Sequence, residues 1–253
     1  MKKIICLIMA MLLMGAFLVS CEDNNAQDTA TDDPYANHIA PKYADIDLSD
    51  IDSLDGVAES TEATDYVIID VKDYGKIVVR LFPDVAPRTV ENFKKLVAAK
   101  AYDGLIFHRV IDKFMVQGGG YKQGADITRD EPEDADSIKG EFTQNGFVNN
   151  LKHTRGVLSM ARTNVPDSAS NQFFICHKTS GVKHLDGAYA AFGYVVYGMD
   201  VVDAIAKVST DSNDQPVNDI VISSVRFATV TVTPPATDSE TTTDTEVSTD
   251  TAN

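Results

Sequence analysis

An arginine, two large apolar side chains and an amide lie within nine positions of one another near the middle of the chain: Arg109, Phe114, Met115 and Gln117. Side chains alternate between faces along a strand, so Met115 and Gln117 are expected to share a face, with Arg109 beside them on a neighbouring strand. An arginine is always charged and carries several hydrogen-bond donors on a rigid plane. These residues predict a surface that is partly apolar and partly cationic.

The elements that must position these residues are mostly strands. Short β-branched or aromatic runs separated by turn residues predict eight of them, at residues 66–71, 76–82, 105–110, 114–118, 157–161, 173–176, 191–196 and 220–227. Apolar residues recur with helical spacing in two further segments, 87–99 and 199–208. Many strands with two helices predict a mainly β fold, a closed antiparallel barrel capped by helices.

Five separated motifs carry a more specific signal, at residues 75–87, 107–119, 158–161, 170–175 and 185–187. In this order and with these gaps they resemble the cyclophilin family of prolyl isomerases, over roughly residues 66–227. The resemblance implies the cyclophilin fold, a closed eight-stranded antiparallel barrel capped by two α-helices. That fold agrees with the elements expected from the sequence pattern.

By this resemblance Arg109 is the catalytic residue of a peptidyl-prolyl isomerase. An X-Pro bond rotates in tens to hundreds of seconds because a barrier of about 18–20 kcal/mol opposes it. Rotation returns the lone pair to the proline nitrogen, which becomes a better hydrogen-bond acceptor. A fixed donor at that nitrogen therefore stabilises the twisted state more than the planar one. No bond is broken, and no cofactor is expected.

The resemblance assigns ten further residues to substrate binding. An apolar pocket for the proline ring is implied for Phe114, Met115, Phe174 and Leu185. Two amides, Gln117 and Gln172, are expected either to bind the substrate backbone or to hold Arg109 in place. The resemblance further implies that four residues form an edge for the residue that precedes proline and the rim of the pocket: Ala161, Arg162, His184 and Tyr189.

Three of these positions depart from the family pattern. Arg162 stands where the family usually has Asn, His184 where many members have Trp, and Tyr189 where many have His. The chain contains no tryptophan, so the indole donor that favours cyclosporin in sensitive members is missing. We expect weak cyclosporin binding and conserved peptide binding, with catalytic efficiency depending on Tyr189.

A charged loop at residues 121–140 lies beside the implied site. It is expected to be a solvated loop, and its acidic residues suggest a preference for basic residues next to proline in the substrate. The histidines His108, His153 and His177 lie in different segments without ligand spacing, so no metal site is expected. Cys176, which ends an apolar run, is expected to be a buried structural thiol.

The amino terminus predicts export. Lys2 and Lys3 precede an apolar run that is too short to span a bilayer comfortably, and residues 18–21 resemble the lipobox of bacterial lipoproteins. That resemblance implies lipidation of Cys21 and attachment to the extracytoplasmic face of a bacterial membrane. The alternative is an ordinary signal peptide with a chance cysteine.

Charge divides the chain into four parts. Residues 22–65 hold thirteen acidic residues against one lysine, and residues 234–253 hold five against none. We therefore predict a lipoprotein signal peptide at 1–20, an acidic disordered tether at 21–65, the isomerase domain at 66–233 and a disordered, acidic, Thr-rich tail at 234–253. The nearly neutral domain has no basic stripe, which argues against nucleic-acid binding.

The predicted partners are proline-containing unfolded or extended polypeptides, with the membrane as the site of anchoring and a monomer as the default state. Two other functions fit the same fold. One is a chaperone that binds proline-containing segments without turnover, which the intact Arg109 disfavours. The other is a surface-adhesion lipoprotein in which the barrel is only a scaffold.

Overall fold

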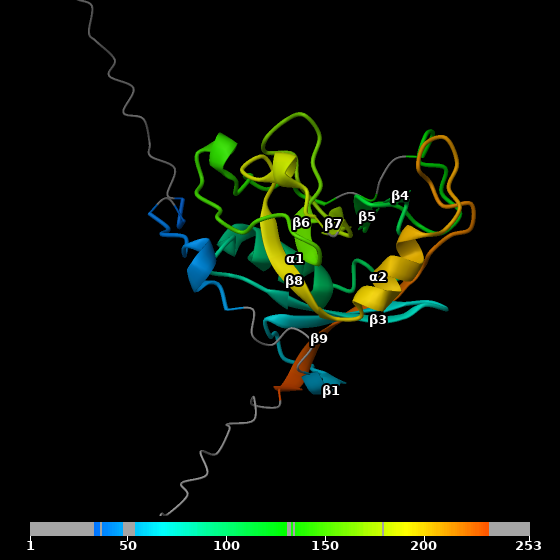
Figure 1. Cartoon of the computed structure of the whole chain (residues 1–253), viewed down its shortest axis with the longest axis horizontal. Helices are drawn as coiled ribbons and strands as arrows, with labels where there is room; N and C mark the ends of the chain where they lie inside the picture. The colour runs from blue at the N-terminus through cyan, green and yellow to red at the C-terminus, as the bar shows by residue number, and fades with distance from the viewer. Residues whose placement is uncertain are drawn as a thin grey trace, which may run out of the picture. The chain divides into compact units, whose positions relative to one another are not determined.

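The computed structural model describes residues 33–35, 37–47, 54–130, 133, 135–178 and 180–232 (Figure 1). The chain divides into two compact units, Met1–Ala36 and Asn37–Asn253. In the first unit, Asp33 Oδ1 accepts a hydrogen bond from Tyr35 N at 3.0 Å. The predicted signal peptide, the lipidation residue Cys21, tether residues 21–32, 36 and 48–53, and the tail at 234–253 lie outside the described residues.

The second unit is built on a nine-stranded sheet in which all neighbouring strands are antiparallel. The order of strands is β1-β9-β2-β3-β8-β6-β7-β5-β4. Their bounds are β1 Leu54–Glu59, β2 Tyr66–Val71, β3 Gly75–Leu81, β4 Arg109–Ile111, β5 Met115–Gly118, β6 Val157–Met160, β7 Phe173–Cys176, β8 Ala191–Tyr197 and β9 Ile222–Val232.

The predicted mainly β fold is confirmed, and the predicted number of strands is corrected from eight to nine. Among the described residues no strand pair joins β1 to β4, the two ends of the order. The chain before β4 instead reaches the start of β9 through an isolated bridge, Ile106 to Val221, and a hydrogen bond from Phe107 N to Ile220 O at 2.9 Å. Because β4 has only three residues, these contacts do not extend into a regular strand pair.

Two parts of the predicted disordered tether are folded. Strand β1 pairs with the end of β9, from Leu54 opposite Val232 to Glu59 opposite Ala228. The β1 sequence, LDGVAE, contains a glycine and two acidic residues and lacks the alternation that indicates a strand. Its hydrogen-bonding partner is supplied by a segment far along the chain, so local sequence does not reveal it.

The second folded part of the tether, residues 37–47, lies against the loop that follows 3-10 helix η2, Thr143–Asn145. The His38 ring stacks on Phe147 with 5.4 Å between centroids, and Asn150 Nδ2 donates to Pro41 O at 2.8 Å. Ile46 packs against a buried apolar cluster that also contains Leu185. The folded domain therefore begins well before residue 66.

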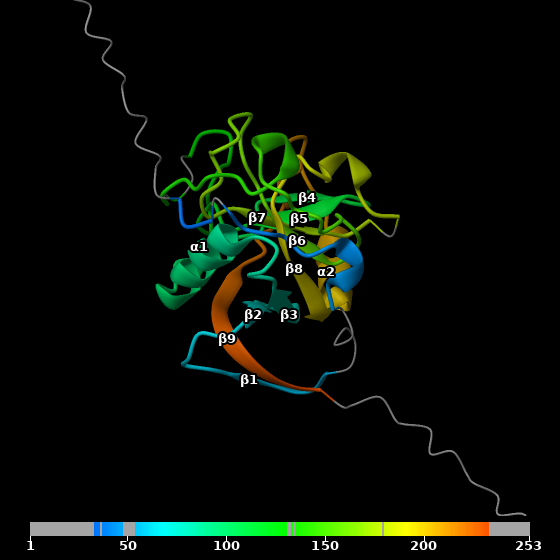
Figure 2. The same ribbon diagram turned by 90° about the vertical axis from the view of Figure 1, so that its left-hand side faces the viewer.

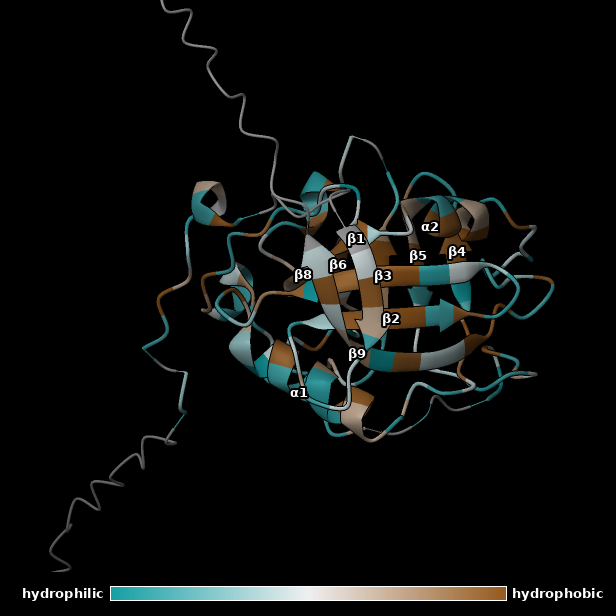
Figure 3. Cartoon of the chain, turned by 90° about the horizontal axis from the view of Figure 1, so that it is seen from below, coloured by the Kyte–Doolittle hydropathy of each residue, from teal (hydrophilic) through white to brown (hydrophobic). Residues whose placement is uncertain are grey.

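Two helices, α1 Pro87–Ala98 and α2 Met199–Ala206, contact the sheet at β9 and β3 respectively (Figure 2). Helix α1 is amphipathic, as the alternating hydropathy colours along it show (Figure 3), and it buries Val90, Phe93 and Val97. The Phe93 ring contacts Phe173 of β7 edge-on at 5.7 Å between centroids. None of the helices in the described ranges is long and apolar enough to cross a membrane.

The N-terminus of α1 is capped by a buried residue from a distant loop. The residue before the helix, Ala86, offers no side-chain cap. Glu141, which is fully buried, accepts hydrogen bonds at Oε1 from Arg88 N at 3.0 Å and at Oε2 from Thr89 N at 2.8 Å and Thr89 Oγ1 at 2.7 Å. A carboxylate is favourable here because it satisfies free N–H groups at the positive end of the helix dipole.

We expect Glu141→Gln to destabilise the domain by about 2 kcal/mol, because the amide replaces one acceptor oxygen by a donor that faces buried N–H groups. The measurement is the free energy of unfolding in urea. Glu133→Gln is the control, since Glu133 forms only an exposed ion pair with Lys122 at 3.0 Å. Equal stabilities of the two variants would contradict this role for Glu141.

Candidate functional site

Antiparallel register brings one residue from each of four neighbouring strands into a single row. Arg109 of β4 lies opposite Gln117 of β5, which lies opposite Phe174 of β7. Phe174 in turn lies opposite Ser159 of β6. Directly opposed residues of antiparallel strands face the same side of the sheet. The row therefore joins a guanidinium, an amide, an aromatic ring and a hydroxyl.

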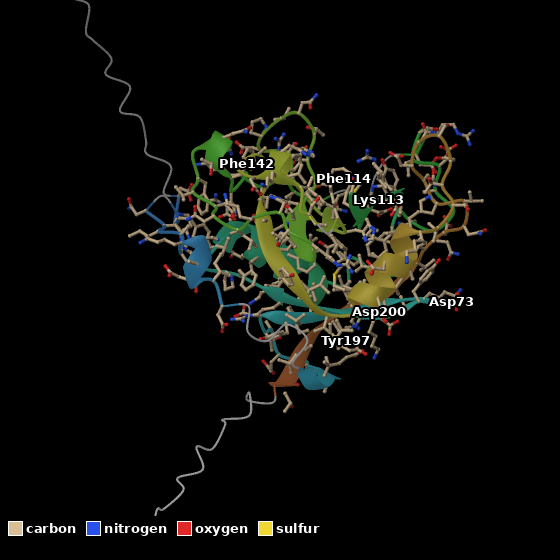
Figure 4. The ribbon with its side chains drawn as sticks, viewed as in Figure 1. Asp73, Lys113, Phe114, Phe142, Tyr197 and Asp200 are labelled. Carbon is tan, nitrogen blue, oxygen red and sulfur yellow. The ribbon has the colours of Figure 1, made fainter. Side chains whose placement is uncertain are left out.

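A cavity of about 120 Å³ opens beside this row. The buried side chains Met115, Phe174 and Leu185 form its apolar part, and the half-buried Arg109 and Gln117 form its polar part. Figure 4 shows Phe114, which also lines the cavity, on the side of the domain away from β1. The full lining is Arg109, Phe114, Met115, Gln117, Ala161, Arg162, Phe174, Leu185 and Tyr189.

All nine lining residues are among the eleven that the sequence predicted for the site. The other two lie just outside the cavity, and each contacts a lining residue. Gln172 Oε1 accepts a hydrogen bond from Gln117 Nε2 at 2.9 Å, so it fixes the amide that lies opposite Arg109. His184 is exposed, and its ring lies 5.9 Å from that of Phe114.

A buried polar chain supports the aromatic wall of the cavity. His153 Nε2 and Ser159 Oγ are 3.0 Å apart, and His153 Nδ1 and Asp186 Oδ1 are 3.1 Å apart. The His153 ring also stacks on Phe174 with 6.1 Å between centroids. Asp186 directly follows η3, Lys183–Leu185, so the chain ties Leu185 to the strand row. Because Ser159 is fully buried, this arrangement positions the wall and does not offer a nucleophile.

Arg109 has an anionic partner from a distant loop. Its Nη2 lies 3.3 Å from Asp214 Oδ2, and each side chain is about 40% exposed, 39% for Arg109 and 41% for Asp214. The backbone reinforces the contact, because Val110 N donates to Asp214 O at 2.8 Å. Asp214 therefore orients the guanidinium from the side of the loop that precedes β9.

Arg162, the second guanidinium on the cavity, is held by neutral groups. Its Nε and Nη2 donate to Ala188 O at 3.1 and 2.8 Å, and its Nη1 donates to Thr163 O at 2.8 Å. The guanidinium also lies over two rings, 4.6 Å from the centroid of Tyr189 and 4.9 Å from that of Phe142. Two departures from the family pattern, Arg162 and Tyr189, are thus in direct contact.

Sequence reasoning missed the residues that position the site. No sequence pattern indicates that Asp214 contacts Arg109, because this contact depends on the path of the loop before β9. Ser159 and Asp186 lie inside two of the motifs that carry the resemblance, and those motifs were the signal that could have found them. His153 was considered only as a metal ligand.

His108 is buried behind the row and adjoins Gln172. The pKa of His108 is lowered to about 4, mainly because the ring is buried, and the nearby charge of Arg109 lowers it further. Hydrogen bonds with the Ile106 backbone and Gln172 raise the pKa but do not offset burial. Burial likewise lowers the pKa of His153, although Asp186 opposes that shift. Both imidazoles are therefore neutral at pH 7.

The charged loop at 121–140 forms its own ion pairs. Asp126 pairs with Arg129 at 2.7 Å, Glu133 with Lys122 at 3.0 Å, and Asp136 with Lys95 of α1 at 3.6 Å. Among the described residues of this loop, none lines the cavity. Three of the four described acids of the loop are thus paired with cations, whereas Asp130 Oδ2 accepts a hydrogen bond from Asp126 N at 2.7 Å.

Cys176 belongs to the core and not to the lining of the cavity. Cys176 is buried, and burial raises the pKa of its thiol to about 12, so it is an inert part of the core. Within the part of the chain that the structure describes, no three His, Cys, Asp or Glu side chains are grouped so as to hold a metal ion.

Known proteins resemble both the sequence and the fold. Residues 66–227 match the family described as cyclophilin type peptidyl-prolyl cis-trans isomerase/CLD. A peptidyl-prolyl cis-trans isomerase of Acinetobacter baylyi is 40% identical over 163 residues, which cover 63% of this chain and 82% of the relative. Peptidyl-prolyl cis-trans isomerase B of Escherichia coli is 40% identical over 163 residues, covering 60% and 94% of the two chains.

A solved structure shares the fold. The cyclophilin type peptidyl-prolyl cis-trans isomerase of Cryptosporidium parvum aligns with a TM-score of 0.54 and 26% identity, covering 67% of this chain and 99% of that one. A second crystal structure of that protein, in the presence of the dipeptide Ala-Pro, aligns with a TM-score of 0.53 and 29% identity, covering 64% and 98%.

We expect stability to fall as pH drops through the window set by His108. Its folded-state pKa of about 4 lies below the ordinary histidine value of 6.5, so between these values the unfolded state binds more protons. Above pH 6.5 the neutral His108 makes its full contribution to the free energy of unfolding. As the pH falls from 6.5 to 4, that free energy decreases by up to about 1.4 kcal/mol per pH unit. Urea unfolding of the wild type and His108→Gln between pH 4 and 7.5 measures it. Parallel pH profiles of the two proteins would contradict this origin.

Proposed function

This chain belongs to the cyclophilin-type peptidyl-prolyl cis-trans isomerase family and is itself a peptidyl-prolyl cis-trans isomerase, and we propose that Arg109 carries the catalysis. The observation that carries the proposal is that Arg109 and four apolar side chains line one small cavity. That arrangement places a permanent donor beside a pocket that suits an apolar ring.

The apolar part of the cavity binds the proline ring in this proposal. Phe114, Met115, Phe174 and Leu185 offer the ring a dry, concave surface. The polar chain from Asp186 through His153 supports Phe174 from behind, so the wall stays rigid. The related Cryptosporidium parvum protein, crystallised in the presence of Ala-Pro, supports a proline-containing peptide as the ligand.

Arg109 acts on the proline nitrogen. As the peptide bond twists, amide resonance is lost and that nitrogen accepts a hydrogen bond from the guanidinium, which stabilises the twisted state more than either planar isomer. Asp214 keeps the guanidinium in one orientation, so little reorganisation is needed during rotation. Gln117, fixed by Gln172, is the amide that binds the peptide backbone beside it.

The expected result of Arg109→Ala is a loss of about 10²–10³-fold in kcat/KM, the effect of removing one preorganised donor. Arg109→Lys keeps the charge but not the rigid plane of donors, so it should recover only part of the activity. The measurement is cis/trans exchange in an X-Pro peptide followed by NMR. Arg129→Ala, in the exposed loop, is the control. Wild-type rates in Arg109→Ala would refute the assignment.

We further propose that the protein is exported and lipid-anchored through Cys21 on the extracytoplasmic face of a bacterial membrane. The basic residues Lys2 and Lys3, the short apolar run and the small residue before Cys21 support this proposal. Acyl chains on one residue give membrane affinity through their buried methylenes. Exported polypeptides whose prolines isomerise after translocation are then the substrates, and His184 leaves cyclosporin binding weak.

Cys21→Ser should move the protein from the membrane fraction to the soluble fraction of a bacterial host, because it removes the acceptor of the lipid. Cys6→Ser lies inside the predicted signal peptide and is the matched control, which should stay with the membrane. Mass spectrometry of the mature N-terminal peptide detects the acyl chains directly. Membrane attachment that survives Cys21→Ser would overturn the proposed anchor.

A further inference from the structure

Two guanidinium groups line the same cavity, and their charges are compensated differently. Arg109 pairs with the carboxylate of Asp214 at 3.3 Å. Arg162 donates only to the carbonyl oxygens of Ala188 and Thr163 among the described residues, and it has no carboxylate partner there. Neutral acceptors satisfy donors but do not cancel a charge. The cavity therefore carries one compensated and one uncompensated cation.

The position of Arg162 is fixed before any substrate binds. Three hydrogen bonds hold its guanidinium, and the rings of Phe142 and Tyr189 lie on it at 4.9 and 4.6 Å. A salt bridge at a protein surface is usually weak, in part because two long side chains must be ordered to form it. Here the arginine is already ordered, so an ion pair with an incoming carboxylate loses conformational entropy mainly on the side of the carboxylate.

Arg162 also keeps donors for a ligand. A guanidinium has five N–H donors. The three hydrogen bonds use the Nε donor and one donor on each Nη, which leaves one N–H on each terminal nitrogen. Because the side chain is only half-buried and lines the cavity, a carboxylate at the rim can reach it.

The strand row sets the side of the substrate that meets this charge. Arg109 is at the β4 end of the row, and Arg162 follows β6 at the other end, where Ala161 N donates to Gln172 O at 2.9 Å. The apolar part of the cavity suits the proline ring, and the neighbouring side chains of a peptide then lie towards its polar rim, which includes Arg162. The family resemblance implies that Ala161 and Arg162 offer an edge to the residue that precedes proline, so with the proline nitrogen at Arg109 that residue lies towards Arg162.

We propose that Arg162 is a specificity-determining residue that favours substrates with Glu or Asp immediately before proline. This inference rests on the proposed function, and it replaces the expectation that the charged loop selects basic residues. The interaction is electrostatic, so it weakens as salt screens the charges.

The test uses full-length protein and four peptides that differ only in the residue before proline: Glu, Gln, Leu or Lys. NMR exchange gives kcat/KM for each, with the uncatalysed rate of the same peptide subtracted. We expect Glu to exceed Gln by about two- to fivefold at low salt, the range of exposed ion pairs, and Lys to fall below Gln. The Glu-to-Gln ratio should approach one at 0.5 M salt, a concentration at which the screening length is only about 4 Å.

Variants assign the effect to Arg162. Arg162→Gln should bring the Glu-to-Gln ratio to about one, Arg162→Lys should retain part of the preference because it keeps the charge, and the control Arg129→Gln should leave the ratio unchanged. A merely structural role for Arg162 would lower all four rates together without changing the ratio. Since the ratio is measured within each protein, partial unfolding of a variant does not mimic the expected result.

A wild-type ratio of one at low salt, or a preference that survives Arg162→Gln, would overturn the inference. A preference for Glu after proline and not before it would overturn the assigned position. Failure of the proposed function is distinct, because the wild type would then accelerate none of the four peptides.

Discussion

The register of four short antiparallel strands is the constraint on which the site depends. Pairing of β4 with β5, β5 with β7 and β7 with β6 places Arg109, Gln117 and Phe174 side by side, although they come from separate parts of the chain. A slip of one residue in any pair would turn one of these side chains to the opposite face. Such a slip is costly because these strands also carry core residues. Val116 and Ile175, for example, lie opposite each other and are buried, and a slip would turn one of them away from the core.

Buried polar groups extend this control from the strands to the loops. Glu141 joins the loop after the charged segment to the start of α1, and Asp186 joins η3 to the strand row through His153. Glu141 and His153 are buried, so removing the partner of either would leave an unsatisfied buried atom. The hydrogen bonds of Asp186 thus hold the segment that carries Leu185, in addition to the apolar contacts of Leu185 itself.

Much of the fold and site could be predicted from the sequence, and the failures have a common cause. Eight strands, two helices and the lining of the cavity were predicted because local alternation and separated motifs carry that information. Strand β1 was assigned to a disordered tether because its sequence is acidic and contains Gly56, and only the end of β9 supplies its hydrogen bonds. Residues 37–47 were assigned to the tether for the same reason, because their contacts with Phe147 and Asn150 come from a distant loop.

The sequence by itself determined the residue types of the site, since an arginine, an amide and apolar side chains in this order specify a donor beside an apolar pocket. It could not determine the electrostatics of that pocket. Whether a guanidinium is neutralised depends on which group lies within a few ångströms, and Asp214 and Ala188 reach Arg109 and Arg162 only after the chain has folded. Coulomb interactions act through space, so the tertiary structure alone decided that Arg109 is paired and that Arg162 retains an uncompensated charge.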